Sequence, residues 1–423
     1  MKKYVTIVNT VIIGLFVSFL FSGCVKDTIT RTYTYSWYEP LYKAKAEVYA
    51  DIIKSNPGRE IENPGKIFII GKYIFLNEIG RGIHVIDNSN PASPKNIAFI
   101  AIAGNLDLAV KGNILYADIY SDLVALDITN PLQVVNTKIV ENAFPVSSYY
   151  QYGYGADSNK IVYDWVRHDT TIVGDYHPQT RGPQVSYDYL ANFSSQNPNA
   201  GQTPVGIGGS MARFAVVNNN LYTVGTSDLN VFNITTPGNP ILQDKVNVGN
   251  WNIETIFPFK NKLFIGSQNG MYVYNVSNPD QPSLDGEFGH VQSCDPVIAD
   301  DNYAYVTLRS GTRCQGFANQ LDILKLNDFT NSSLVKTYDL TNPHGLSKDG
   351  DILFICDGAD GLKIYDAGDV DNLKLIKRFS GLETYDVIAN NNIAFVVAKD
   401  GLYEYDYSDV DNIHLLGKIT ISK

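Results

Sequence analysis

The sequence lacks the features that mark nucleic-acid-binding, disordered and multi-span membrane proteins. Its 33 Lys and Arg residues stand against 44 Asp and Glu residues, a net charge of −11. This shortage of basic residues argues against nucleic acid as the main partner, because phosphate binding needs a basic surface. Hydrophobic residues are 44% and aromatic residues 12% of the 423 residues, so the chain can bury a core and is not disordered. Beyond the first two dozen residues there is no long apolar run.

Motifs for common catalytic chemistry are also missing. The sequence has no phosphate-binding Gly-rich loop ending in Lys-Ser/Thr, no Cys-x-x-Cys, no His-Glu-x-x-His and no Gly-x-Ser-x-Gly, and the cysteine spacings do not suit a structural zinc centre. His290, His344 and Asp295 are an alternative metal set, and residues 357–361 (DGADG) hint at a calcium loop without its remaining ligands. We predict no metal and no cofactor, and residues 357–361 are predicted to be a turn.

The N-terminus is predicted to be a lipoprotein signal peptide covering residues 1–23. Lys2 and Lys3 precede an apolar stretch that ends in Phe21-Ser22-Gly23-Cys24. A transmembrane anchor is the alternative, but this stretch is short and interrupted by polar residues. Cys24 after Ser-Gly is similar to a bacterial lipobox, although Phe21 stands where Leu is usual. Cys24 is therefore the predicted lipidation site, and acylation by two or more chains gives lasting membrane attachment.

Residues 24–63 are predicted to be a tether between the lipid and the rest of the chain. The Tyr-rich stretch 31–42 is predicted to be a strand and residues 40–54 a short helix, with Pro40 in its first turn.

From residue 64 onward one pattern recurs seven times. An aliphatic residue or Ala is followed by an aromatic anchor, and in six copies an apolar pair closed by Asp or Asn follows 11 or 12 residues later. The aromatic anchors are Phe75, Tyr116, Tyr222, Phe264, Tyr305, Phe354 and Phe395. Within each repeat, apolar and polar residues alternate with period two, and Asn/Gly turns and Pro-bearing turns separate the alternating runs. This pattern predicts four short strands in each repeat. Four strands per unit of about 42 residues predict an all-β, seven-bladed β-propeller over residues 64–423, with six or eight blades as alternatives.

The Val85-Ile86-Asp87 repeats and their Pro-bearing turns resemble the LVIVD-repeat proteins of bacterial and archaeal surfaces. Residues 208–214 (GGSMARF) look like a segment of Bacteroidetes lipoproteins in that group. The resemblance implies a propeller fold and a surface location, and it implies no particular activity.

The four-stranded repeat separates two ends of the propeller. The short turns between first and second and between third and fourth strands share one end, here called the turn end. The connections between second and third strands and between blades share the other, the loop end, which varies and is the candidate working face. Residues 141–209, between blades two and three, form an aromatic-rich insertion that we expect to emerge at the loop end, either as a packing cap or in contact with a ligand.

Polar residues at the starts of the innermost strands are the candidate ligand site. A solvated channel wall, with Lys66 and Arg213 paired to the carboxylates, is the alternative interpretation. The candidate ligand residues are Lys66, Asp107, Arg213, Trp251, Glu254, His290, Asp295, His344, Asp386 and, from the insertion, Trp165.

Two cysteines are predicted to form a disulfide. Cys294 opens the first strand of blade five and Cys314 lies in the enlarged loop after its second strand, so both come to the same end of one blade. Cys356 lies in an apolar strand and is predicted to be a buried free thiol.

These features predict a lipid-anchored protein of the cell envelope, held at the outer membrane on its periplasmic or its outer side. The leading hypothesis is a non-enzymatic binding or scaffold module for an envelope protein or a glycan. The alternatives are a polysaccharide hydrolase or lyase using Asp107, Glu254, Asp295 or Asp386, which rests on fold analogy, and a purely structural envelope protein.

Overall fold

The structure is a computed structural model that describes residues 30–52, 54–144, 160–175, 206–225, 227–248, 253–289, 296–311, 317–327 and 331–421. The predicted signal peptide and Cys24 lie outside these residues. So do Trp251, His290, Cys294, Asp295 and Cys314.

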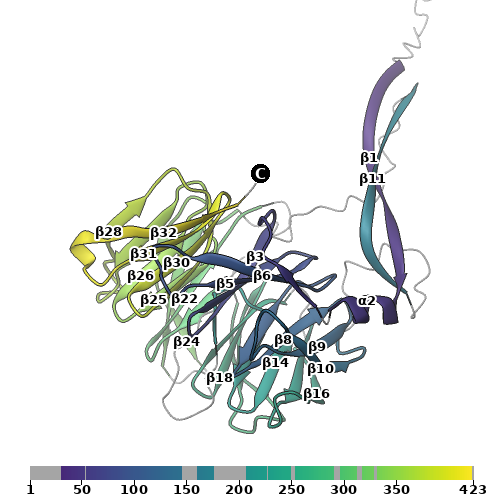
Figure 1. Ribbon diagram of the computed structural model, residues 1–423. Coiled ribbons are helices and arrows are strands. Elements are labelled where there is room, and N and C mark those ends of the chain that lie inside the picture. The colour runs from purple at the N-terminus through teal and green to yellow at the C-terminus, as the bar shows by residue number, and fades with distance from the viewer. Residues whose placement is uncertain are drawn as a thin grey trace, which may run out of the picture. The chain divides into compact units, whose positions relative to one another are not determined.

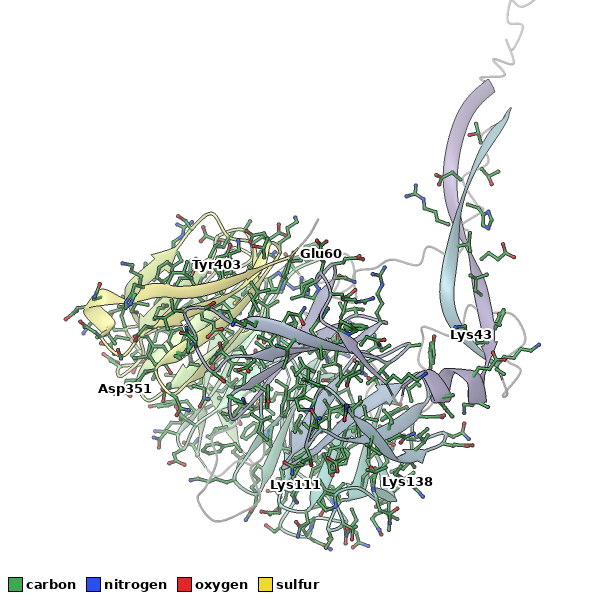
Figure 2. All side chains as sticks on the ribbon, viewed as in Figure 1. Lys43, Glu60, Lys111, Lys138, Asp351 and Tyr403 are labelled. Atoms are coloured by element: carbon green, nitrogen blue, oxygen red, sulfur yellow. The ribbon has the colours of Figure 1, made fainter. Side chains whose placement is uncertain are left out.

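Seven antiparallel sheets form the propeller, as the repeats predict (Figure 1). Blade one is β3 (Pro64–Ile70), β4 (Tyr73–Glu78), β5 (Gly82–Asp87) and β6 (Lys95–Ala101); blade two is β7 (Leu108–Lys111), β8 (Ile114–Ile119), β9 (Asp122–Asp127) and β10 (Val135–Val140); blade three is β13 (Phe214–Val217), β14 (Asn220–Val224), β15 (Asp228–Asn233) and β16 (Ile241–Asn247). Blade four is β17 (Ile253–Phe259), β18 (Lys262–Ser267), β19 (Gly270–Asn275) and β20 (Ser283–Gly289); blade five is β21 (Val297–Ala299), β22 (Tyr303–Leu308), β23 (Gln320–Leu326) and β24 (Ser332–Asp339). Blade six is β25 (Leu346–Asp349), β26 (Ile352–Cys356), β27 (Leu362–Asp366) and β28 (Lys374–Phe379); blade seven is β29 (Thr384–Asn390), β30 (Ile393–Ala398), β31 (Gly401–Asp406) and β32 (His414–Thr420). First strands of successive blades contact one another, so these strands line the central channel.

The hairpins at the turn end depend on left-handed backbone positions. In six blades the first residue of the turn between the first and second strands has a positive φ. This conformation favours Gly and Asn. The residues are Gly71, Gly112, Asn218, Lys260, Gly350 and Asn391, with φ of 56°, 57°, 53°, 54°, 55° and 50°. Five of the six are Gly or Asn, which is why the turns were recognisable in the sequence.

The aromatic anchors join each blade to the next. Tyr116 of blade two donates its hydroxyl hydrogen to the Pro237 carbonyl of blade three at 2.8 Å. Tyr222 of blade three donates to the Pro279 carbonyl of blade four at 2.7 Å. Both rings are fully buried, so each satisfies its hydroxyl while filling the space between blades. In blades two and three the Tyr anchor and the Pro-bearing turn of the next blade therefore act together, and the other anchors, four of them Phe, are buried without this bond.

Blade seven closes the ring without a strand from the N-terminus, because β29 to β32 all come from the C-terminal repeat. The yellow strands of blade seven lie beside the dark blue β3 and β5 of blade one in Figure 1. Apolar residues of both blades share one core cluster, including Ile67, Ile388 and Phe395. Asn88 of blade one also donates from Nδ2 to Glu404 Oε2 of blade seven at 2.8 Å.

Segments outside the repeats add strands to the fold. The predicted strand 31–42 is confirmed as β1 (Thr30–Ala44), which pairs with β11 (Lys160–Asp175) of the insertion in a separate two-stranded sheet. β2 (Ser55–Pro57) pairs with β6 on the outer edge of blade one, and β12 (Ile207–Gly208) pairs with β3 on its inner edge.

The predicted helix is shorter than expected. It is α2 (Lys45–Ile52). A short 3₁₀ helix, η1 (Val410–Asn412), lies between β31 and β32 of blade seven. The expectation that Pro40 occupies a helical first turn is wrong, because residues 40–44 continue strand β1. Across the described residues, none of the helices has the length and hydrophobicity needed to cross a membrane.

Candidate functional site

The end of the insertion runs inside the central channel. The Gly206 amide donates to the Val110 carbonyl near the turn end of β7 at 2.9 Å. Ile207 and Gly208 then pair with Ile69 and Phe68 of β3. The segment continues to Arg213 at the start of blade three, and residues 206–212 are all buried. We call residues 206–213 the channel segment.

The channel segment contacts inner strands on several sides of the ring. Ser210 accepts a hydrogen bond from the Leu346 amide of blade six at 2.7 Å. Ala212 accepts one from the Ile256 amide of blade four at 2.8 Å. Met211 is 1% exposed and belongs to the core cluster shared by blades one and seven. The channel is therefore filled by the chain's own residues along this route.

This path corrects the expected position of the insertion. Strand β10 ends at the loop end, as predicted, but the chain returns at the turn end, where Gly206 meets Val110, and runs back towards the loop end. The expectation that the insertion emerges only at the loop end is wrong for its last residues. A long segment joins β10, the fourth strand of blade two, to β13, the first strand of blade three. The short direct crossover used between other blades is therefore not required here.

Of the predicted polar residues at the inner strand starts, Lys66, Asp107, His344 and Asp386 are buried, and Lys66, Asp107 and the Arg213 amide bond to one another. Lys66 Nζ lies 2.8 Å from Asp107 Oδ2, and the Arg213 amide also donates to this oxygen. Asp107 Oδ1 accepts from the Leu108 amide at 2.7 Å. Lys66 and Asp107 are 7% and 2% exposed. Pairing of Lys66 with a carboxylate agrees with the alternative interpretation, but the pair is buried rather than solvated.

Burial controls the charges of this group. Burial lowers the pKa of Lys66; the charge of Asp107 opposes that shift, and the charge of Arg213 adds to it. Asp118, which sequence reasoning missed, accepts hydrogen bonds at Oδ1 from the Leu106 and Asp107 amides. Burial nevertheless raises the pKa of Asp118 to about 7.

Asp386 and His344 form the other side of the site. Burial raises the pKa of Asp386 well above its usual range, although its hydrogen bonds, including the one from Ser210 at 3.4 Å, oppose the shift. Burial lowers the pKa of His344 to about 3, with a smaller contribution from Arg309. A Cβ on Gly345 would lie 1.9 Å from Asp386 Oδ1, so blades six and seven meet here at a position that only glycine fits.

Other predicted site residues are distributed more widely. Glu254 lies in β17, where it accepts a hydrogen bond from Gln268 Nε2 at 2.9 Å. Trp165 lies in β11, in a different compact unit from the propeller. Trp251, His290 and Asp295 lie outside the described residues, so their ligand roles stay predictions.

The acidic turn at residues 357–361 is a turn, as predicted. Asp357 accepts hydrogen bonds from the Thr341 and Asn342 amides, and Lys363 Nζ lies 2.6 Å from Asp357 Oδ2 and 2.7 Å from Asp360 Oδ2. Amides and a lysine therefore occupy the oxygens that a calcium ion would need. No group of three or more His, Cys, Asp or Glu side chains suited to a metal occurs in the part of the chain that the structure describes.

Cys356 lies in β26 and is a fully buried free thiol, as predicted. Burial raises the pKa of this thiol well above its usual range, and the Asp386 charge adds to the shift. Both cysteines of the predicted disulfide lie outside the described residues.

Fold and channel together define a seven-bladed β-propeller whose channel holds a segment of the same chain. Within this class, the LVIVD repeat model matches residues 64–99 and 104–139, which correspond to blades one and two. The chain therefore carries LVIVD repeats. No curated protein matches the chain.

Solved structures share the architecture at low sequence identity. The computationally designed Ika8 protein is 12% identical over 87% of this chain and 89% of that chain, with a TM-score of 0.50. A protein from Lactobacillus plantarum is 15% identical over 85% and 97%, with a TM-score of 0.52. The periplasmic gluconolactonase PpgL of Pseudomonas aeruginosa is 11% identical over 84% and 96%, with a TM-score of 0.51. These similarities concern the fold alone.

Proposed function

We propose that this protein is a lipid-anchored β-propeller of the cell envelope that binds another envelope component without catalysing a reaction. The anchor is Cys24, and the location is the outer membrane of a Bacteroidetes-type bacterium. The support for the anchor is the basic and apolar N-terminal pattern that ends in Ser22-Gly23-Cys24. The partner is an envelope protein or a glycan, bound at the loop end.

The observation that carries the proposal is the burial of the channel carboxylates. A glycoside hydrolase uses two carboxyl groups that reach both sides of the scissile bond. Asp107 is bound by Lys66 and by backbone amides, and Asp386 is fully buried beside Ser210. Because these two carboxyl groups are buried and already hydrogen-bonded, they favour a binding role over hydrolase or lyase chemistry at the channel mouth.

An exposed aromatic at the loop end supports a binding role further. Phe317 lies in the connection between β22 and β23 of blade five and is 99% exposed. Exposed aromatic side chains on connections over a rigid scaffold are typical contact residues for a partner.

The lipid anchor is tested by metabolic labelling of the full chain with an alkyne fatty acid in a bacterial host. We expect labelling of the wild-type chain, loss of labelling in Cys24→Ala, and unchanged labelling in Cys356→Ala. Labelling that persists in Cys24→Ala would contradict the assignment.

The binding role is tested by affinity capture from solubilised envelope membranes together with a glycan array. We expect a partner whose capture weakens in Phe317→Ser and is unchanged in Leu375→Ser, which alters a 53% exposed residue at the turn end of β28. Failure of both assays to yield a ligand would overturn the proposal, and release of new reducing ends from mixed glycans would favour the hydrolase instead.

A further inference from the structure

The joints between neighbouring blades are built alike at six of the seven positions around the ring. In each of these six, a third-strand residue of one blade shares a core cluster with a residue at or just beyond the end of the third strand of the next blade. Both residues are apolar and buried. The six pairs are Val85 with Ile128, Ala125 with Ile234, Val231 with Val276, Val273 with Leu326, Ile323 with Ala367, and Ile364 with Tyr407.

The seventh joint, which closes the ring, carries a polar pair at the same two positions. Glu404 of blade seven lies opposite the anchor Phe395, just as Ala125 lies opposite the anchor Tyr116. Glu404 is 0% exposed, and its Oε2 accepts a hydrogen bond from Nδ2 of Asn88 of blade one at 2.8 Å. Among the residues that the structure describes, no other blade has a polar residue at either position.

Glu404 and Asn88 can satisfy each other's remaining polar atoms. Glu404 Oε1 and Asn88 Oδ1 are buried and have no hydrogen-bond partner within the described ranges. Burial raises the pKa of Glu404 to about 7, and Asn88 opposes this shift, so the carboxyl group is largely protonated at lower pH. A protonated carboxyl group and a primary amide can exchange two hydrogen bonds, and the second bond would use these two oxygens.

The backbone beside the pair adds a steric condition. Gly417 of β32 lies opposite Glu404, and a Cβ at Gly417 would lie 2.2 Å from the Pro91 carbonyl oxygen of blade one. The corresponding residue of blade six is Lys377, which lies opposite Ile364. The turn that holds Pro91 therefore fits against blade seven, whereas the side chain of Lys377 would obstruct it on blade six.

We propose that Asn88 and Glu404 form a clasp that selects blade seven as the closing partner of blade one. Similar repeats can also close wrongly, with blade six on blade one or blade seven on blade two, which leaves one blade outside the ring. The first error places Ile364 against Asn88, and the second places Glu404 against Ile128. Each error buries a polar group opposite an apolar residue, which is unfavourable. Buried polar residues fix the register of coiled coils in the same way.

The test is refolding of the purified full chain, kept in detergent, after the clasp is removed. The double variant Asn88→Ile/Glu404→Val gives the closing joint apolar residues like those of the other six. Each protein is unfolded in urea, refolded by dilution and digested briefly with a protease. Mass spectrometry then measures the fraction of chains cut within blade one or blade seven, which is the mis-closed fraction. We expect this fraction to be roughly tenfold higher in the double variant than in wild type.

Stability is measured alongside, because a merely structural role would lower it without affecting closure. The urea midpoint of the double variant should equal or exceed that of wild type, since apolar replacement of a buried polar pair is often neutral or stabilising. Glu404→Gln keeps a polar partner for Asn88 and should close as faithfully as wild type. Ile323→Val, at the joint between blades five and six, should lower stability slightly without raising the mis-closed fraction.

Equal mis-closed fractions in wild type and the double variant would overturn the inference, and so would an equally large rise in Ile323→Val. If the double variant does not refold, Glu404→Val alone decides. The clasp predicts that cuts in this variant concentrate in blades one and seven, and cuts spread evenly over all blades would contradict it. The clasp is independent of the proposed binding role, because neither residue belongs to the loop-end site.

Discussion

The Leu346 amide donates to Ser210 Oγ at 2.7 Å, across a separation of 136 residues. Leu346 begins the innermost strand of blade six, and Ser210 belongs to the segment that enters the channel before blade three. The bond is buried, so blades that are distant in the sequence share one interior through the channel segment. This segment makes the channel part of the core rather than a water-filled passage.

The channel segment requires glycine at position 206. A Cβ there would lie 2.2 Å from Phe68 Cε1 and 2.9 Å from the Ile69 carbonyl oxygen. Gly206→Ala should therefore destabilise the propeller by about 1–3 kcal/mol, the usual cost of overpacking a core. Gly238→Ala is the control, because its Cβ would meet nothing closer than 3.5 Å. Thermal unfolding should show a lower midpoint for Gly206→Ala only, and equal midpoints for both variants would contradict the close packing of Gly206 against Phe68.

The joint between blades seven and one should be sensitive to pH through Glu404. Burial raises the pKa of Glu404 from 4.5 to about 7, with the Asn88 hydrogen bond opposing the shift. Its folded-state pKa lies above the unfolded value, so its stabilising contribution is complete below about pH 4.5 and is lost as pH rises through about 7.

Glu404→Gln carries no titrating group and should keep this contribution at all pH values. The variant should therefore gain stability relative to wild type between about pH 4.5 and 7, reaching on the order of 1–3 kcal/mol above pH 7. Unfolding midpoints of both proteins across this range measure the difference. A difference that does not change with pH would show that Glu404 is not the titrating group.

One hairpin carries a correctable backbone strain. Lys260 has φ 54° in the turn between β17 and β18, where other blades have Gly or Asn. Lys260→Asn should stabilise the protein by roughly 0.5–1 kcal/mol, because Asn tolerates the left-handed region better. The exposed Lys260–Asp301 ion pair that is lost contributes little. Denaturation should show a higher midpoint for this variant, and Asn391→Lys, the reverse change in blade seven, should lower it.

The cysteines should differ sharply in reactivity. Cys356 is fully buried, and burial raises its thiol pKa, so iodoacetamide should label it only after unfolding. Cys294 and Cys314 are predicted to resist labelling until a reductant is added. Peptide mass spectrometry of unreduced protein measures both, and free thiols at Cys294 and Cys314 would refute the disulfide.

Most of the fold could be predicted because its signals are local. Turn residues such as Gly112 and Asn218 fix each hairpin within a few residues of sequence, and the buried aromatic anchors recur because every blade packs on the next in the same way. The outer strand of each blade also carries an irregularity in its pairing, as between Val231 and Phe232. Repetition alone did not reveal this irregularity, because one added residue does not disturb the anchors of the inner strands.

Residue type and position in the repeat were sufficient to predict part of the candidate site. Lys66, Asp107, His344 and Asp386 were identified from their place at the starts of inner strands, and they do come to the same end of the channel. Asp118 and Ser210 were missed. Asp118 lies in a second strand, and Ser210 gives no signal until the path of the channel segment is known.

The sequence by itself determined the four-stranded repeat and its turns, since antiparallel hairpins form between neighbouring residues and each repeat carries its own turns. It favoured seven blades, and the structure excluded six and eight. Only the tertiary structure decided what fills the channel. Residues 206–213 contact inner strands of blades one, two, four, six and seven, and those contacts exist only when the ring has closed around them. The charges of Lys66, Asp118 and Asp386 depend on the same closure, because burial shifts their pKa values and no residue type alone specifies its burial.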